Sequence, residues 1–268
     1  MRKLNTSETV QQLTHFIKAS VTKGGFKQVV VAVSGGVDSA TSASLAVRAL
    51  GKDNVHVLFL PYRNWHDQAG SNARELLNQL QIPRHHIYQV DIGEAVDGVL
   101  KTLDLSTGTK NADERIRIGN IMARERMVVL FDLAKKLNAL VLGTENKSEH
   151  YLGYFTRFGD EASDIEPLRG LYKTEVYELA KYLNVPKSIV DVAPTAGLWS
   201  GQTDEGEFGF TYKEADEILY GLFEAKLSIN ELVKQGLNRE TIERVQKWVK
   251  KIEFKHHLPL VAPPPKSR

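Results

Sequence analysis

The stretch VVVAVSGGVDS, from Val29 to Ser39, decides the fold of this 268-residue chain. Its β-branched valines favour a buried strand, and the residues that follow it, 40–50, have the pattern of a helix. Between them, Gly35 and Gly36 permit a tight turn, because glycine adopts positive φ without strain. Backbone N–H groups in such a turn, together with the positive end of a helix dipole, surround an anion. The stretch therefore predicts a strand, a phosphate-binding loop and a helix.

The acidic residue of this loop, Asp38, indicates a metal ion. A P-loop of the form GxxxxGK[ST] carries a lysine for the phosphates, and this loop has none. A carboxylate at this position would instead hold Mg²⁺ against phosphate oxygens. A simpler interpretation is that the glycines form only a turn and that Asp38 and Ser39 cap the helix. The loop alone does not decide between them.

Apolar segments and amphipathic stretches alternate in the first half of the chain. Strands are predicted at residues 28–33, 55–60, 87–90 and 139–143, and helices at residues 7–21, 38–50, 67–80 and 111–137. The second half is predicted to be helical at residues 173–183, 213–225, 228–235 and 238–251. The alternation predicts an α/β fold with a doubly wound parallel sheet, whose ligands lie beyond the carboxyl ends of the strands.

Composition describes a soluble globular protein. The chain is 42% hydrophobic and 25% charged, which suits a single domain over residues 1–258 followed by a proline-rich tail, 259–268. A net charge of +2 argues against a general nucleic-acid surface. No apolar run reaches about 18 residues and no signal-peptide core is present, so a cytoplasmic protein without membrane spans is expected. The chain has no cysteine, which excludes a thiolate glutaminase within it.

Six further segments accompany the glycine loop. They are GNIMARERM (119–127), GTENKSE (143–149), GYFTRFGD (153–160), PLRGLYK (167–173), PTAGL (194–198) and DEGEFG (204–209). With SGGVDS they resemble the ammonia-dependent NAD synthetases, which are ATP pyrophosphatases, and their order matches that family over residues 6–259. The resemblance implies an adenine nucleotide alpha hydrolase-like sheet of about five strands, and we expect the fifth strand near residues 164–168.

The resemblance also implies an ATP site. Its residues would be Ser34, Gly35, Gly36, Val37, Asp38, Ser39, Ala40, Thr144, Lys173 and Thr195, with Asp38 and Glu149 as Mg²⁺ ligands. The catalytic residues would be Asp38, Lys173 and Asp164. Spacing alone favours simpler roles, in which Thr144 caps a helix, Glu149 is exposed and Lys173 is a surface lysine; Thr195 would be a turn residue.

A second nucleotide, deamido-NAD, is implied against Arg124, Arg157, Asp164, Phe254 and Lys255. Without the resemblance, the arginines around Arg124 would suggest a solvated basic face. The helix that carries Arg124 would also join two subunits in a homodimer. The chain departs from the family pattern here, with Arg157 in place of lysine and Phe254 in place of histidine. Two glycines of the substrate loop are replaced by Glu161 and Ala162.

The implied activity is that of a ligase. The nicotinate carboxylate of deamido-NAD attacks the α-phosphorus of the co-substrate ATP, and ammonia then displaces AMP to give NAD, with Mg²⁺ as the cofactor. Ammonia would arrive free or from a separate glutaminase subunit. The alternatives are another ATP pyrophosphatase, such as a GMP synthetase or a tRNA-thiolating enzyme, and a non-catalytic nucleotide-binding protein. The lack of cysteine weighs against thiolation, and the retained Asp38, Glu149 and Lys173 weigh against a non-catalytic protein.

Overall fold

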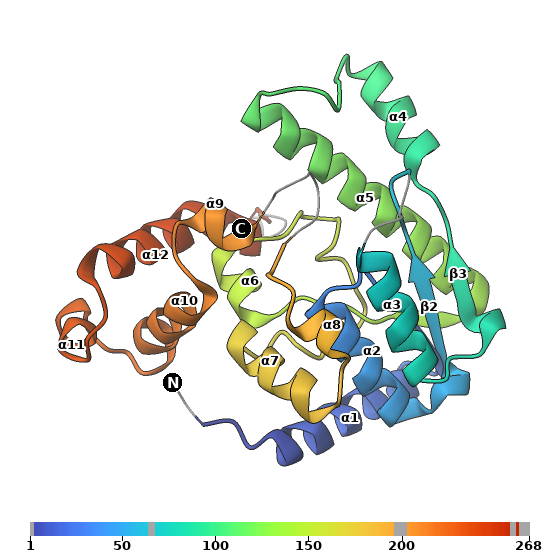
Figure 1. Ribbon diagram of the computed structural model, residues 1–268, viewed down its shortest axis with the longest axis horizontal. Helices are drawn as coiled ribbons and strands as arrows, with labels where there is room; N and C mark the ends of the chain where they lie inside the picture. The colour runs from blue at the N-terminus through green and yellow to red at the C-terminus, as the bar shows by residue number, and fades with distance from the viewer. Residues whose placement is uncertain (1–2, 64–67, 196–202, 258–260, 263–268) are drawn as a thin grey trace, which may run out of the picture.

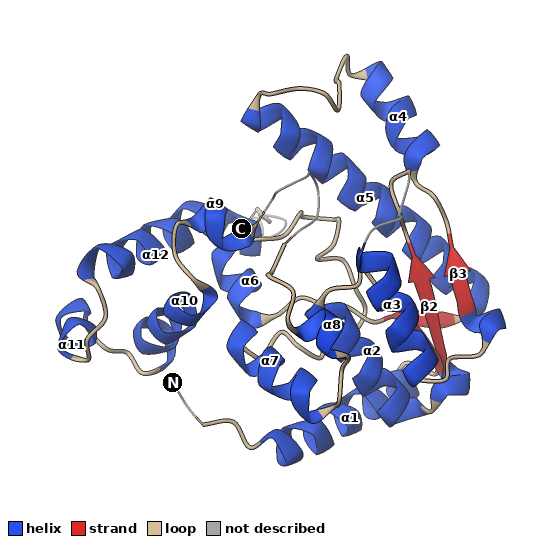
Figure 2. Cartoon of the chain, in the orientation of Figure 1, coloured by secondary structure: helices blue, strands red, loops and turns tan. Residues whose placement is uncertain are grey.

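The computed structural model describes residues 3–63, 68–195, 203–257 and 261–262 (Figure 1). Most of the predicted tail, 259–268, lies outside these residues. The four predicted strands are confirmed as β1 (Gln28–Ala32), β2 (Val55–Phe59), β3 (Ile87–Gln89) and β4 (Ala139–Val141). All pair in parallel in the order β3-β2-β1-β4, with Val30 of β1 opposite both His56 and Val141. Figure 2 shows the strands in red, with β2 beside β3.

The predicted fifth strand is wrong for the residues that the structure describes. Only Leu142 and Ile165 form a parallel bridge there, and the Gly143 N–H donates to the Ile165 carbonyl at 2.8 Å. Pro167, two residues further on, has no N–H to donate, so a ladder cannot extend through it. The segment lies beside β4, but the sheet formed by the described residues has four strands.

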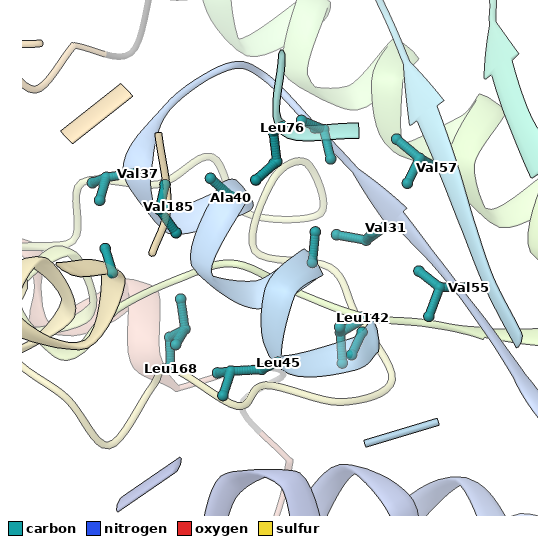
Figure 3. Packing of buried hydrophobic residues seen from close by; sticks show 14 of the residues in the cluster. Val31, Val37, Ala40, Leu45, Val55, Val57, Leu76, Leu142, Leu168 and Val185 are labelled. Carbon is teal, nitrogen blue, oxygen red and sulfur yellow. The ribbon is translucent and has the colours of Figure 1, made fainter. Parts of the chain in front are cut away.

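Helices cover both faces of this sheet. One face carries α1 (Thr6–Lys23), α2 (Val37–Leu50), α3 (Gln68–Gln79), α7 (Lys173–Tyr182) and α8 (Lys187–Val190), and the other carries α4 (Gly93–Thr102) and α5 (Ala112–Leu137). Alternation along β1 explains the arrangement, because Val29 and Val31 pack on the first face and Val30 on the second. Figure 3 shows Ala40 and Leu45 of α2 in the same hydrophobic cluster as Val31 and Val57 of the sheet.

The remaining helices form a group of their own beside the sheet domain (Figure 1). They are α6 (Lys147–Leu152), α9 (Asp204–Phe208), α10 (Tyr212–Leu219), a π-helical turn η3 (Tyr220–Glu224), α11 (Ile229–Lys234), α12 (Arg239–Ile252) and a 3₁₀ turn η4 (Glu253–His256). Their apolar side chains make a third hydrophobic cluster, which includes Leu152, Phe208 and Val245. We call these elements the C-terminal helical group. In the described part of the chain, no helix is both long and apolar enough to span a membrane.

The strand order sets the position of the site. From β1 the chain moves outward through β2 to β3 and then returns to place β4 on the other side of β1. The order therefore reverses between β1 and β4, and in such sheets ligands bind at that switch point, beyond the carboxyl ends of the strands. The glycine loop follows β1 directly, and residues 142–146 follow β4.

A buried histidine on β2 makes the stability of the fold depend on pH. His56 is 4% exposed, and its ring lies 4.2 Å from that of His86. Burial and the neighbouring His86 lower the pKa of His56 from 6.5 to about 4. The unfolded chain then binds more protons than the folded chain in this range, so the contribution of His56 to stability is complete above about pH 6.5 and is lost as the pH falls toward 4.

We therefore expect the melting temperature to fall between about pH 7.5 and pH 5, and to fall less in His56→Gln. Thermal unfolding of both proteins at the two pH values measures the difference. The exposed His15 of α1 supplies the control, since His15→Gln should keep the wild-type dependence. An equal fall in wild type and His56→Gln would show that His56 does not carry the effect.

Candidate active site

The glycine loop is braced by its own serines. Gly35 has φ of 88°, in the region that favours glycine, and α2 begins two residues later. The Gly36 N–H donates to Ser34 Oγ at 3.3 Å, and the Ser34 N–H donates to Ser39 Oγ at 3.2 Å. Ser39 Oγ donates in turn to the Gly36 carbonyl at 3.0 Å. These contacts within the loop fix its conformation at the N-terminus of α2.

Two residues expected at the ATP site point away from it. The side chains of Val37 and Ala40 are buried in the hydrophobic cluster between α2 and the sheet (Figure 3). The Ala40 N–H already donates to the Gly36 carbonyl at 3.1 Å. These two residues therefore anchor the loop to the core, and a contact with ATP would have to come from their backbone.

Three charged residues from distant parts of the chain meet beside the loop. Lys173, the first residue of α7, is 3% exposed, and its Nζ lies 2.5 Å from Asp38 Oδ2 and 2.9 Å from Glu149 Oε1. Burial alone would lower the pKa of Lys173, but the two carboxylates outweigh it and raise that pKa. Burial also raises the pKa of Glu149 to about 8, and Lys173 opposes this shift. One ammonium thus serves two carboxylates, as their assignment to one site requires.

The two carboxylates suit a hard cation. Their oxygens come from different helix starts and converge on the point where the Lys173 ammonium lies. Mg²⁺ is usually held by one or two carboxylates, and phosphate oxygens and water complete its shell. Among the described residues, no three or more histidine, cysteine or acidic side chains form a complete metal site. Asp38 and Glu149 therefore fit a cation that a phosphate ligand shares.

Sequence reasoning missed Asn146, which is fully buried between these groups. Its Nδ2 donates to Asp38 Oδ1 at 2.9 Å, and its Oδ1 accepts the Glu149 N–H at 3.0 Å. It is the N-cap of α6, and Glu149 completes the capping box. The spacing N-x-x-E resembles a capping box, so the sequence contained a signal for the helix start. It contained none for the contact with Asp38.

The two predicted threonines lie at the edges of this group. Thr144 is partly buried in the segment between β4 and α6, two residues before Asn146. Thr195 is exposed and is the last described residue before 196–202. The carbonyl of its neighbour Pro194 accepts the Asp204 N–H at 3.2 Å, so residues 194 and 195 lie beside the start of α9. Their predicted contacts with ATP stay predictions.

Most residues predicted for the second nucleotide form another cluster. Arg124 of α5 donates through Nε to the Arg157 carbonyl at 3.2 Å, and one turn earlier Asn120 accepts the Thr156 hydroxyl at 2.8 Å. The Arg157 guanidinium lies 5.3 Å from the centre of the Phe254 ring. The substrate loop, residues 153–164, is therefore held between α5 and η4.

Two of the predicted residues have structural partners. Lys255 Nζ donates to the carbonyls of Gly153 and Phe155 at 2.6 and 2.7 Å, so it fastens η4 to the substrate loop. Asp164 accepts the Val141 N–H at 2.7 Å and is otherwise exposed beyond the carboxyl end of β4. Asp164 therefore lies at the edge of the sheet where ligands bind, with one carboxylate oxygen tied to the backbone.

A doubly wound parallel sheet with a glycine loop, two carboxylates and a buried lysine at its switch point defines a nucleotide-binding α/β protein. The chain matches the model of the NAD synthase family over residues 9–259. The chain belongs to this family.

Curated relatives and solved structures agree with this family assignment. The chain is 39% identical over 259 residues to the NH(3)-dependent NAD(+) synthetase of Fusobacterium nucleatum, covering 97% of this chain and 96% of that protein. Identity to the enzyme of that name from Pyrococcus furiosus is 44%, with the same two coverages. An NMN synthetase from Francisella tularensis aligns with a TM-score of 0.83 at 37% identity, covering 97% of this chain and 99% of that one. An NH3-dependent NAD synthetase from Campylobacter jejuni aligns with a TM-score of 0.79 at 30% identity, covering 97% and 100%.

The double role of Asn146 predicts a measurable loss of stability in Asn146→Ala. Losing the helix cap costs about 1 kcal/mol, and losing a bond to a charged group costs about 1.5 to 3 kcal/mol. Asn238 is a matched control, because it caps α12 through the Thr241 N–H and is exposed. Asn238→Ala should therefore lose only the cap term of about 1 kcal/mol. Urea unfolding measures both, and equal losses would show that the bond to Asp38 contributes nothing.

Proposed function

We propose that this protein is an ammonia-dependent ligase that converts deamido-NAD, ATP and ammonia to NAD, AMP and pyrophosphate. The observation that carries the proposal is the meeting of Asp38, Glu149 and Lys173 beside the glycine loop in a member of the NAD synthase family. A protein that only bound nucleotide would have no need to bury two carboxylates around a lysine, because the desolvation of charges is costly.

The glycine loop and Lys173 would bind the phosphates of ATP. The first N–H groups of α2 and the positive end of its dipole would face the anion, and the Lys173 ammonium would transfer from the carboxylates to phosphate oxygens. Asp38 and Glu149 would hold Mg²⁺, which supplies positive charge against the leaving pyrophosphate. Together these groups bind the triphosphate and orient its α-phosphorus toward the second substrate.

The chemistry needs no covalent bond to the protein. An oxygen of the nicotinate carboxylate forms a bond to the α-phosphorus as the bond to pyrophosphate breaks, which gives an acyl adenylate. Ammonia then bonds to the carbonyl carbon, AMP leaves, and a proton is lost from nitrogen. Arg124 and Arg157 would position the second nucleotide by charge-assisted bonds, and Asp164 would bind the substrate or accept the proton. Holding water away protects the adenylate from hydrolysis.

Two copies of the chain would form the working enzyme, paired through α5. Ile116 and Val128 of this helix are 52% and 54% exposed, and Arg124 lies between them in the sequence. Apolar side chains exposed on one long helix support an interface there. In this arrangement the substrate that Arg124 contacts would lie next to the partner subunit.

A second candidate differs only in the acceptor. The similar protein from Francisella tularensis is an NMN synthetase, and a nicotinate mononucleotide would present the same carboxylate to ATP. The adenylyl half of deamido-NAD is absent from that acceptor, so the two candidates differ in what the substrate loop binds.

One assay tests the function and separates the two candidates. Purified protein is mixed with Mg²⁺, ATP and ammonium, and with deamido-NAD and nicotinate mononucleotide at equal concentrations. We expect NAD to form in amounts equal to AMP and pyrophosphate, and we expect deamido-NAD to be consumed first. Formation of ADP and phosphate would refute adenylation, and preference for the mononucleotide would favour the second candidate.

The same assay identifies the nitrogen donor. The chain has no cysteine for a glutaminase thiolate, so glutamine in place of ammonium should give no product. Ammonia then comes from solution or from a separate glutaminase subunit. Product formed from glutamine by the purified chain would contradict this expectation.

Arg124→Ala should weaken binding of deamido-NAD about tenfold to a hundredfold, since a bond to a charged group contributes roughly 1.5 to 3 kcal/mol. Affinity for ATP should stay within a few-fold of wild type, because the residues that we propose to bind ATP lie at and beside the glycine loop and do not include Arg124. Titrations with each nucleotide measure the two affinities. Arg117→Ala, an exposed arginine of the same helix, is the control and should change neither. A larger defect for ATP than for deamido-NAD would place Arg124 in the ATP site.

A further inference from the structure

The C-terminal helical group sends one buried carboxylate into the start of α7. Asp216 of α10 is 0% exposed. Its Oδ1 accepts the Ser148 hydroxyl of α6, and its Oδ2 accepts the N–H and the hydroxyl of Thr174 at 2.9 and 2.8 Å. Asp216 therefore joins α6, α7 and α10 at one point, and that point is one residue from Lys173.

Ser148 extends this contact to Lys173 itself. The Lys173 N–H donates to Ser148 Oγ at 2.8 Å, while the same hydroxyl donates to Asp216. The first N–H groups of a helix have no partner within the helix. At α7 the first two, from Lys173 and Thr174, are bound by Ser148 and Asp216. Asp216 thus fixes the backbone from which the Lys173 side chain extends.

The same helix also contacts the other end of Lys173. Tyr212 lies one turn before Asp216 on α10, and the Lys173 Nζ is 5.2 Å from the centre of its ring. The Tyr212 hydroxyl donates to Asp204 at 3.0 Å, so the ring is held in place. A lysine side chain has many rotamers to lose when it is fixed. Contacts at both its backbone and its ammonium restrict it to one position.

We propose that Asp216 is a positioning residue, which sets the Lys173 ammonium for the phosphates of ATP by binding the start of α7. This inference rests on the proposed function, because it assumes that Lys173 contacts ATP. It gives the C-terminal helical group a part in the active site, although that group packs around a hydrophobic cluster of its own.

The test is a double-mutant cycle on ATP binding in the presence of Mg²⁺. The four proteins are wild type, Asp216→Asn, Lys173→Met and the double variant. Asp216→Asn keeps the shape of the side chain and removes its charge. We expect ATP to bind about tenfold more weakly, because a displaced Lys173 ammonium would lose part of one charge-assisted bond to phosphate. In the Lys173→Met background the same change should cost less than about twofold, because the residue that Asp216 positions is gone.

Glu224 offers a matched control within the same group. Its carboxylate accepts hydrogen bonds from Lys147 Nζ at 2.5 Å and from the Tyr172 hydroxyl at 2.6 Å, so it joins η3 to α6 and to the residue before α7. It accepts nothing from Lys173 in these contacts. Glu224→Gln should leave ATP affinity within about twofold of wild type, even where it lowers the melting temperature as much as Asp216→Asn does.

Ser148→Ala is the second variant, and it carries the test if Asp216→Asn does not fold. It removes only the hydroxyl between Asp216 and Lys173, and it should weaken ATP binding in the wild-type background but not with Lys173→Met. Equal losses in both backgrounds, or a loss in Glu224→Gln as large as in Asp216→Asn, would overturn the inference. Normal ATP affinity in Lys173→Met would instead overturn the assignment of Lys173 and, with it, the proposed function at this residue.

Discussion

The site depends on one buried ammonium shared by two carboxylates. Lys173, Asp38 and Glu149 stand in the first turns of α7, α2 and α6, so three helix starts meet at the switch point of the sheet. Helix starts present unpaired N–H groups and positive dipole ends, which favour the carboxylates and, later, phosphate. Without Lys173, two carboxylates would face each other at low solvent exposure, which is strongly unfavourable. The fold therefore supplies a cation at the position where a Mg²⁺ bound to a nucleotide would also be stabilised.

This constraint explains the polar groups buried around the site. A charge taken from water needs hydrogen bonds on all sides, so Asn146 donates to Asp38 while it caps α6. The start of α7 needs acceptors for its N–H groups, which Ser148 and Asp216 provide. Each of these residues serves a helix end and a charged group at once. Local helix formation and the geometry of the site are therefore stabilised by the same contacts.

The sequence could predict the elements better than the contacts between them. The valines of β1, the glycine loop and the 26-residue helix α5 follow from local pattern, and the structure shows Asn111 as the N-cap of α5. Helices α4, α6, α8 and α9 were missed because they have only 10, 6, 4 and 5 residues, and a helical pattern is recognised securely only over longer stretches. The convergence of Asp38 and Lys173, 135 residues apart, depends on strand order, which no local spacing encodes. The family resemblance assigned both residues to an ATP site, whereas their ion pair and the contacts of Asn146 and Asp216 required the structure.

The substrate loop shows how two departures from a family pattern can depend on each other. Arg157 stands where the resemblance leads one to expect lysine, and Phe254 where it leads one to expect histidine. The two side chains are in contact, with the guanidinium 5.3 Å from the ring centre. A planar guanidinium stacks on an aromatic face better than an ammonium does, and phenylalanine offers such a face without competing for protons. The positive charge at Arg157 is kept, while the side chain beside it is apolar, Phe254, instead of the histidine that the resemblance leads one to expect. Lys255 of the same turn donates to the carbonyls of Gly153 and Phe155, so the turn that carries Phe254 is fixed against the loop that carries Arg157.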